Sequence, residues 1–515
     1  MPAAIKYIDD PNSKDSINLE TAYTREINAR QKQYKSGWDY YYGRHKQHLR
    51  DDGTNTQDNV TINLCELLLD KGVSSLMGTS DQGAIRGPDF EVVQAAQPPT
   101  ATAAPANTES DNPSADWLDK VWEVNSKAIL LHDLALNGGA CGHLFIKIIP
   151  EGLPDPDDPE KMLPRLVVLN PANVTPFWDA GDVCRVLWYR IQFGEGDNAV
   201  NNPNGAAKRE DIIREIDADG NDTGAWVVRS FIRSQGRWRQ QGKDIRWTYS
   251  WPPIVDWKNL PRPNEYYGLN DIRGNGNLND GLNFTASNMQ RIIKHHAKPK
   301  TVATGVKENE PVESSVDTLY TITSPDAKVY NLEMQSDLTS SLNYMHFLRQ
   351  AFFDSGRELD PATVQDKLGA LTNFGLRVLF RDSLEKTGTK RLLYGAGLRI
   401  VCQRLLELGG FGANNKVVDT WTDPLPLDPL PTAQALQIDR NNGLSEETYL
   451  ETRGYDIEKE RQRREQTVAE QALGNTLTQQ GTLLARFRSM QNGQTNGQQP
   501  ATTAAANGTA VGRAA

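Results

Sequence analysis

A glycine-rich run, GNGNLNDG at positions 274–281, is a candidate for a nucleotide-binding loop. Its spacing does not fit G-x-G-x-x-G, and no strand–helix–strand pattern precedes it, as a dinucleotide-binding loop requires. The phosphate-binding pattern G-x-x-x-x-G-K-[ST] is found nowhere in the chain. We therefore interpret the run as a flexible helix start and expect no cofactor there.

The adjacent histidines His295 and His296 are candidates for a metal site. Neighbouring residues on a helix point about 100° apart, so they rarely share one ion, and no cysteine or carboxylate cluster lies near them. The sequence also lacks a G-x-S-x-G elbow and any recognisable Cys–His signature. We therefore expect no metal, no catalytic residue and no enzyme activity. The cysteines are far apart, which argues against a disulfide scaffold and fits a reducing compartment: Cys65, Cys141, Cys184 and Cys402.

A basic cluster follows the same segment and leaves two interpretations open. Its residues lie at the C-terminal end of a predicted helix, where cations complement the helix dipole. Repeated around a ring, they could instead touch phosphates transiently or pair with acidic groups of a partner. The cluster consists of Arg291, Lys294, Lys298 and Lys300.

An acidic cluster surrounds a break in the helical pattern at 356–370, against Arg357 and Lys367. Capping and solvation of helix ends are one interpretation, and Asp360 before Pro361 suits an N-cap. The other is a mostly acidic constriction that repels DNA, although salt screens its field beyond about 8–10 Å. The acidic residues are Asp354, Glu358, Asp360 and Asp366.

Composition suggests an extended chain with several modest cores. The 515 residues allow two to four domains, and a hydrophobic content of 38% is low for one compact globule. A net charge of −10 argues against a protein that mainly grips a nucleic-acid backbone. We find no signal-peptide pattern and no run of about 18 apolar residues that would span a membrane. The aromatic run Tyr40, Tyr41 and Tyr42 is interpreted as a core anchor rather than a base-stacking set.

Periodicity divides the first half of the chain into helices followed by strands, an α+β unit at 115–258 with mixed or antiparallel strands. Gly78 should close the second helix, and Gly138-Gly139 should stop the third. The predicted elements are a surface helix at 16–50, a buried helix within 59–78, a flexible insertion at 94–114, a helical stretch at 115–142, strands at 143–150, 165–179, 184–193 and 224–234, and a loop at 194–211.

The second half is predicted to be mostly helical. Glycines at 388, 395 and 397 suggest a kink in its longest helix. The predicted elements are a helix at 268–297, strand and loop at 298–335, a helix at 336–355, a break at 356–370, a kinked helix at 371–408, a strand near 416, a charged helix at 456–488 and a disordered tail at 491–515.

The order of these pieces resembles the portal (head-to-tail connector) proteins of tailed bacteriophages. Each motif is weak alone, and their order over about residues 60–466 carries the resemblance. The matching stretches are ALNGGACGHLFIKIIP at 135–150, RLVVLNPANVTPFWD at 165–179, the segment from IVDWKNLPRPNEYYGLNDI to HHAKP at 254–299, and the segment from VVDTWTDPLPLDP to GLSEETYL and onward at 417–466.

The resemblance implies an α+β portal fold with wing, long-helix stem, small clip and helical crown, assembling as a ring usually of twelve subunits. Prolines within 251–272 would turn the chain from wing to stem, and Gly268 would free the helix start. The implied parts are a wing at 1–267 with a return strand near 415–430, stem helices at 268–297 and 336–355, a clip at 298–335, a tunnel loop at 356–370 that includes Glu358, Asp360, Asp366 and Lys367, a long helix and return strand at 371–430, a crown at 431–490 and a disordered tail at 491–515.

The implied role is structural: a ring at one capsid vertex, assembled in the host cytoplasm, through which double-stranded DNA is packaged and ejected without sequence specificity. The implied partners are the terminase large subunit, the major capsid and scaffolding proteins, and a head-tail adaptor or tail protein. Another neck or minor head protein is an alternative, and a nucleic-acid-processing enzyme is a second one. Replacing 358–366 by a Gly/Ser linker is predicted to leave the ring intact and impair DNA packaging.

Overall fold

The computed structural model has two compact units, Met1–Pro426 and Leu427–Ala515. In the second unit only isolated positions between 437 and 461 are described, so the predicted crown, charged helix and tail lie outside the described residues, as does the insertion at 94–111. The structure describes residues 7, 9–46, 59–78, 85–93, 112–179, 181–194, 207–216, 222–297, 300–304, 326, 328–332, 338–360, 373–412 and 415–424.

Four helices precede the main sheets: α1 (Lys14–Tyr41), α2 (Leu64–Met77), α3 (Pro113–Val124) and α4 (Lys127–Cys141). The predicted closing glycine of α2 is confirmed, since Gly78 ends it at φ 75°. Helix α1 ends at Tyr41, earlier than predicted, and the predicted third helical stretch is two helices.

The expectation that Gly138-Gly139 stops a helix is wrong, because α4 runs through both residues and ends at Cys141. Their role is close packing. A Cβ atom on Gly138 would lie 2.1 Å from the hydroxyl of Tyr394, and one on Gly139 would lie 2.7 Å from Leu69 Cδ2. The helix ends instead at Gly142, whose φ of 87° suits glycine.

Two antiparallel sheets form the middle of the chain. The larger has the order β4-β5-β6-β7-β8, with β9 also paired to β7, and the smaller has the order β10-β2-β3. The predicted loop at 194–211 extends too far, because β6 already starts at Lys208. The polar side chains of Arg209 and Asp211, which suggested a loop, are buried in β6 and pair with each other. The bounds are β2 His143–Pro154, β3 Met162–Leu169, β4 Val174–Trp178, β5 Val186–Phe193, β6 Lys208–Ile216, β7 Asp222–Ser234, β8 Arg237–Gln240, β9 Ile245–Trp247 and β10 Ile254–Lys258, with a 3-10 turn at Pro171–Asn173.

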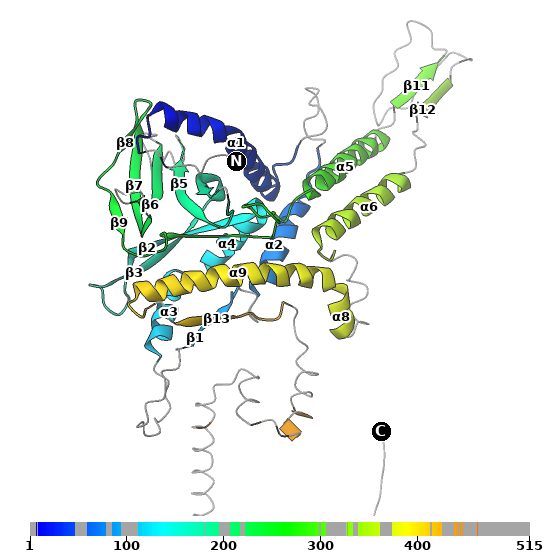
Figure 1. Cartoon of the computed structure of the whole chain (residues 1–515). Helices are drawn as coiled ribbons and strands as arrows, with labels where there is room; N and C mark the ends of the chain where they lie inside the picture. The colour runs from blue at the N-terminus through cyan, green and yellow to red at the C-terminus, as the bar shows by residue number, and fades with distance from the viewer. Residues whose placement is uncertain are drawn as a thin grey trace, which may run out of the picture. The chain divides into compact units, whose positions relative to one another are not determined.

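Two long helices, α5 (Asn275–Ala297) and α6 (Thr339–Gly356), lie side by side in Figure 1. The strands β11 (Lys300–Thr304) and β12 (Lys328–Leu332) follow α5 in the chain and pair with each other. The helix predicted at 336–355 is confirmed as α6. Helix α5 starts seven residues later than predicted, after a turn that occupies 268–274.

The last helices are α8 (Asn373–Leu379) and α9 (Arg381–Leu408). The predicted helix at 371–408 is interrupted at Phe380, between α8 and α9. Helix α9 is continuous through Gly388, Gly395 and Gly397, so the interruption does not lie at the glycines that suggested a kink. Strand β13 (Lys416–Thr420) then returns to pair with β1 (Asp89–Val93), which confirms a strand near 416.

The main core lies where α2, α4 and α9 pack on one another and on β2, and a second core lies between the sheets. Central residues of the main core, such as Leu68, Leu134 and Val401, are fully buried. No helix among the described residues is long and apolar enough to cross a membrane.

Candidate functional site: the base of the two long helices

The crossing from β10 to α5 is tied down by buried amides. Asn259 is fully buried; its backbone N–H donates to Gly142 O (3.0 Å), its side-chain amide donates to Leu269 O (3.1 Å), and its Oδ1 accepts from the Tyr394 hydroxyl (2.9 Å). Glycine at 268 serves close approach, since a Cβ there would lie 2.5 Å from Gly142 O. The turn between sheet and helix is therefore a fixed joint.

The crossing is stabilised by four buried charged side chains that we call the charged hub: Asp271, Glu358, Lys386 and Lys390. Lys390 Nζ lies 2.8 Å from Asp271 Oδ2, and Lys386 Nζ lies 3.4 Å from Asp271 Oδ1 and 3.8 Å from Glu358 Oε1. The Ser383 hydroxyl donates to Glu358 Oε2 at 2.9 Å. Two lysines of α9 thus hold Asp271, in the turn before α5, and Glu358, shortly after α6.

Burial opposes charge in the hub, and the lysines decide the outcome at Asp271. Burial alone would raise the pKa of Asp271, but the charges of Lys390 and Lys386 outweigh it and lower that pKa to about 2. At Glu358 burial outweighs the attraction of Lys386 and raises the pKa. Burial likewise lowers the pKa of Lys390.

Lys386 of the hub and one further cation, Lys71, hold the chain at and just after the C-terminal end of α6. Lys386 Nζ donates to Gly356 O at 3.0 Å, and Lys71 Nζ donates to Leu359 O at 2.8 Å. The last carbonyls of a helix carry partial negative charge, so ammonium groups stabilise them. Arg349 of α6 holds Asp360 through two bonds of 2.6 and 2.8 Å. The chain after Asp360 therefore leaves from a fixed point.

These contacts place two of the four residues predicted for a tunnel loop. Glu358 and Asp360 are 9% and 7% exposed and are paired, so the expectation that they are solvated is wrong. The N-cap role expected of Asp360 concerns a helix start at Pro361, which lies outside the described residues. Glu358 pairs with the buried Lys386 of α9, and Asp360 pairs with the partly exposed Arg349 of α6; no local pattern indicated either partner. Asp366 and Lys367 lie outside the described residues, and a channel-lining role for any of the four stays a prediction.

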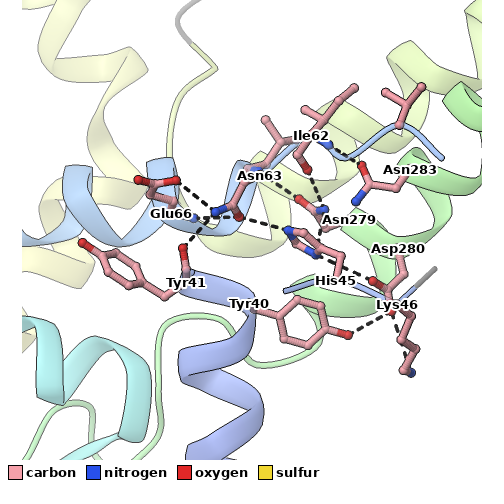
Figure 2. A network of polar contacts seen from close by, with 12 residues as sticks. Tyr40, Tyr41, His45, Lys46, Ile62, Asn63, Glu66, Asn279, Asp280 and Asn283 are labelled. Atoms are coloured by element: carbon pink, nitrogen blue, oxygen red, sulfur yellow. Dashed lines mark hydrogen bonds and ion pairs between the residues drawn. The ribbon is translucent and has the colours of Figure 1, made fainter. Parts of the chain in front are cut away.

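A second feature, which we call the asparagine ladder, lies on the adjoining face of α5 (Figure 2). Its members Asn279, Asn283 and Ser287 are one helical turn apart and almost completely buried. They accept hydrogen bonds from alternate backbone N–H groups of 60–64: Leu64 to Asn279 Oδ1 (3.0 Å), Ile62 to Asn283 Oδ1 (2.9 Å) and Val60 to Ser287 Oγ (2.9 Å).

The ladder works because two repeats match in length. Four helical residues rise about 6 Å and two extended residues about 6.6 Å, so each turn of α5 meets every second residue of 60–64. Asn275 continues the spacing and donates to Phe352 O of α6 at 3.1 Å. Sequence reasoning missed the ladder, although Asn275, Asn279 and Asn283 at intervals of four were a visible signal.

His45 and the tyrosines close the ladder at its lower end (Figure 2). His45 Nε2 lies 3.1 Å from Asn63 Oδ1, the N-cap of α2. The hydroxyls of Tyr40 and Tyr41 donate to Asp280 (2.9 Å) and Asp70 (3.3 Å). The core-anchor interpretation of these two tyrosines is confirmed, while Tyr42 is exposed and stacks on Trp38.

The predicted basic cluster is only partly described. Arg291 is half-buried and Lys294 exposed in the last turns of α5. Lys300 begins β11, and Lys298 lies outside the described residues, so the contacts of the cluster as a whole stay a prediction. Within the described ranges no group of three or more His, Cys, Asp or Glu side chains is arranged to hold a metal ion.

Comparison with known proteins gives a limited result. No family model and no curated protein matches the sequence. Among solved structures, a chain from the neck of an empty gene transfer agent particle is 12% identical, with 76% of this chain and 90% of that chain covered and a TM-score of 0.42. A chain from the virion of a native gene transfer agent particle is 12% identical, with 80% and 96% covered and a TM-score of 0.38. Both TM-scores are too low to bear on the function of this chain.

Proposed function

We propose that this chain is a non-enzymatic structural subunit of a phage-type portal, and that copies of it form a ring around an axial channel for double-stranded DNA. The observation that supports this most is the joint between the sheets and the two long helices. One strand–turn–helix crossing leads into α5, a hairpin lies between α5 and α6 in the chain, and one charged hub joins the approach to α5 with the exit from α6.

Such a joint suits a ring subunit because the helices must keep their direction while neighbouring copies press on them. The asparagine ladder holds α5 to the segment 60–64 that leads into α2, and the hub holds the end of α6 to α9. Buried hydrogen bonds and ion pairs help to specify one geometry, because breaking them leaves polar groups unpaired away from water. The sequence resemblance to portal proteins, whose stretch 254–299 includes this joint, points to the same role.

Apolar side chains on the two long helices supply a surface for neighbouring copies. Tyr344 and Phe347 of α6 are 52% and 62% exposed, and their rings stack at 6.4 Å. Phe284 and Ile293 of α5 are also exposed. Exposed aromatic clusters of this kind favour association. Head-to-tail contacts between copies would cover them and close into a ring.

The ring would sit at one vertex of the capsid shell, dock a separate packaging ATPase and capsid or scaffolding proteins, and later bind a head-tail adaptor. The net charge of −10 suits a channel that lets DNA pass without gripping it.

Native mass spectrometry with negative-stain averaging of the full chain tests the proposal. We expect a closed ring of about a dozen 57.3-kDa copies with a central hole. The double variant Tyr344→Ser/Phe347→Ser should shift the population to monomers. Asn343→Ser, an exposed polar change on the same helix, is the matched control and should leave the ring intact.

A chain that stays monomeric at high concentration and in the presence of scaffolding protein would refute the ring. Rings that persist unchanged in the double variant would move the subunit interface away from α6. Unfolding midpoints of both variants, measured in urea, separate loss of assembly from loss of folding.

A further inference from the structure

A cavity of about 510 Å³ lies beside the sheets, lined by residues of β2, β5, β6, β7 and β10, the turn before β5, and α9. This volume is in the range of small-molecule sites, roughly 300–1,000 Å³. It belongs to neither the charged hub nor the asparagine ladder, and its interpretation does not rest on the proposed function.

The charge of the lining is unbalanced. Four of its side chains are cationic, Arg185, Arg214, Lys258 and Arg404, and two are carboxylates. The chain as a whole carries −10, so a cationic cavity runs against its average charge.

Two of these cations bond only to neutral oxygens in the part of the chain that the structure describes. Lys258 Nζ donates to the carbonyls of Glu265 (2.6 Å) and Arg262 (3.4 Å). Arg404 Nη1 donates to the carbonyls of Ile254 (2.6 Å) and Pro252 (2.9 Å). Burial lowers the pKa of Arg404 to about 10, which leaves the group charged at pH 7.

Both carboxylates of the lining are already engaged. Asp256 accepts from His143 Nε2 (2.9 Å), the Tyr189 hydroxyl (2.7 Å) and the Tyr266 hydroxyl, and the hydrogen bond from His143 helps to lower its pKa against burial. Asp182 accepts from the backbone N–H of Cys184 at 2.9 Å. Asp256 and Glu407 still act on the charge of Arg404 through space, but neither forms a hydrogen bond to it among the contacts that the structure describes.

The walls add aromatic surface and one orphaned polar atom. Tyr189, Tyr266 and Trp226 line the cavity. His143 is 2% exposed, also lines the cavity, and its Nδ1 has no hydrogen-bond partner. Buried polar atoms normally have partners, so His143 Nδ1 is a hydrogen-bonding atom that a bound group could use.

We propose that this cavity is a binding site for a small organic anion, whose phosphate or carboxylate oxygens pair with Lys258 and Arg404 while its body packs on the aromatic wall. Charge-assisted hydrogen bonds to Lys and Arg are the strongest that a protein offers such oxygens. The aromatic side chains give a planar ligand an apolar surface.

Cys184 makes the site directly testable, because it lines the cavity and is exposed, whereas Cys65, Cys141 and Cys402 are buried. The rate at which a thiol reagent labels Cys184 in the folded full-length chain would be followed against increasing inorganic phosphate, citrate or adenosine monophosphate. Sodium chloride at equal ionic strength is the control. We expect at least one probe to slow labelling severalfold, with saturation, and chloride to have no such effect.

Lys258→Met should raise the half-saturating concentration about tenfold, and Lys416→Met, which removes an exposed lysine outside the cavity, should leave it unchanged. Absence of protection by all three probes would overturn the proposal, as would protection that chloride reproduces or that Lys258→Met leaves unaltered. If Lys258→Met fails to fold, the comparison of the probes with chloride on the unmodified chain decides. Stronger protection by phosphate or adenosine monophosphate than by citrate would indicate a phosphate ligand, and the reverse order would indicate a carboxylate ligand.

Discussion

The ammonium of Lys390 lies 2.8 Å from Oδ2 of Asp271, and the two side chains are 2% and 1% exposed. Asp271 stands before α5 and Lys390 lies within α9, 119 residues further along the chain. This one contact fastens the start of a long helix to the helix that runs through the main core.

Removing one partner of this pair should cost much more than removing a surface charge. Lys390→Met leaves the buried Asp271 with only Lys386 beside it, and we expect a loss of about 3–5 kcal/mol in the free energy of unfolding. Urea titration measures it. Arg381→Met, which breaks the exposed Arg381–Glu385 pair, should cost less than about 0.5 kcal/mol. If Lys390→Met lowered the free energy of unfolding no more than Arg381→Met does, the Lys390–Asp271 pair would not stabilise the fold as described.

Acid should weaken the fold through Asp271. Its folded pKa, about 2, is below its ordinary value, so its contribution to stability is present above about pH 4 and is lost as the pH falls toward 2. The loss amounts to about 2 kcal/mol. Asp211 and Asp256, whose pKa values are also lowered, act in the same direction.

The raised pKa of Glu358 acts with the opposite sign. Its contribution to stability grows as the pH falls through its folded pKa toward its ordinary value. Urea midpoints at pH 7, 5, 4, 3 and 2 resolve the two windows. A stability that is independent of pH between 4 and 2 would contradict the assignment to Asp271.

The asparagine ladder predicts a sharp contrast along one helix. Asn283→Leu leaves the N–H of Ile62 without its acceptor in a buried place and should lower the free energy of unfolding by about 1–3 kcal/mol. Asn277→Leu, at an exposed position of α5, should change it by less than about 0.5 kcal/mol. Amide hydrogen exchange at Ile62 should accelerate only in the first variant, and exchange that stays slow would contradict the ladder.

Two glycines of α9 should respond oppositely to alanine. A Cβ at Gly397 would lie 2.3 Å from the Trp257 ring, so Gly397→Ala should cost about 1–3 kcal/mol. At Gly388 a Cβ would meet nothing within 4 Å, so Gly388→Ala should stabilise the helix by about 0.5–1 kcal/mol. Thermal unfolding of the two variants is the measurement, and a shift of the same sign in both would refute this account of α9.

The loop replacement suggested by sequence needs new limits. Residues 358 and 360 belong to the base of the helices, so a linker over 358–366 would remove buried ion pairs together with the loop. A Gly/Ser linker over 361–366 alone should keep the unfolding midpoint and the ring, and should impair DNA packaging if these residues face the channel. Unchanged DNA filling with an intact ring would remove the tunnel-loop assignment and leave the proposed ring untouched.

Local sequence patterns determined most of the elements. The helix at 339–356, the buried helix closed by Gly78 and the antiparallel strands follow from periodicity and capping, which act over a few residues. The predicted helix ends that proved wrong lie where contacts with a distant part of the chain determine the structure. Gly138 and Gly139 look like a helix stop until Tyr394 and Leu69 are seen packed against them.

Only the tertiary structure could bring together the charged hub, the asparagine ladder and the cationic cavity. Asp271 meets Lys390 across 119 residues, and Asn283 meets Ile62 across 221. Whether an exposed-looking Lys or Asn becomes a buried partner depends on which surfaces pack together, a choice made by the summed burial of the whole core. The sequence by itself determined the order of the helices and strands, because helix and strand propensities depend on neighbouring residues. Packing decided which side chains pair, because desolvation and charge pairing depend on residues far apart in the chain.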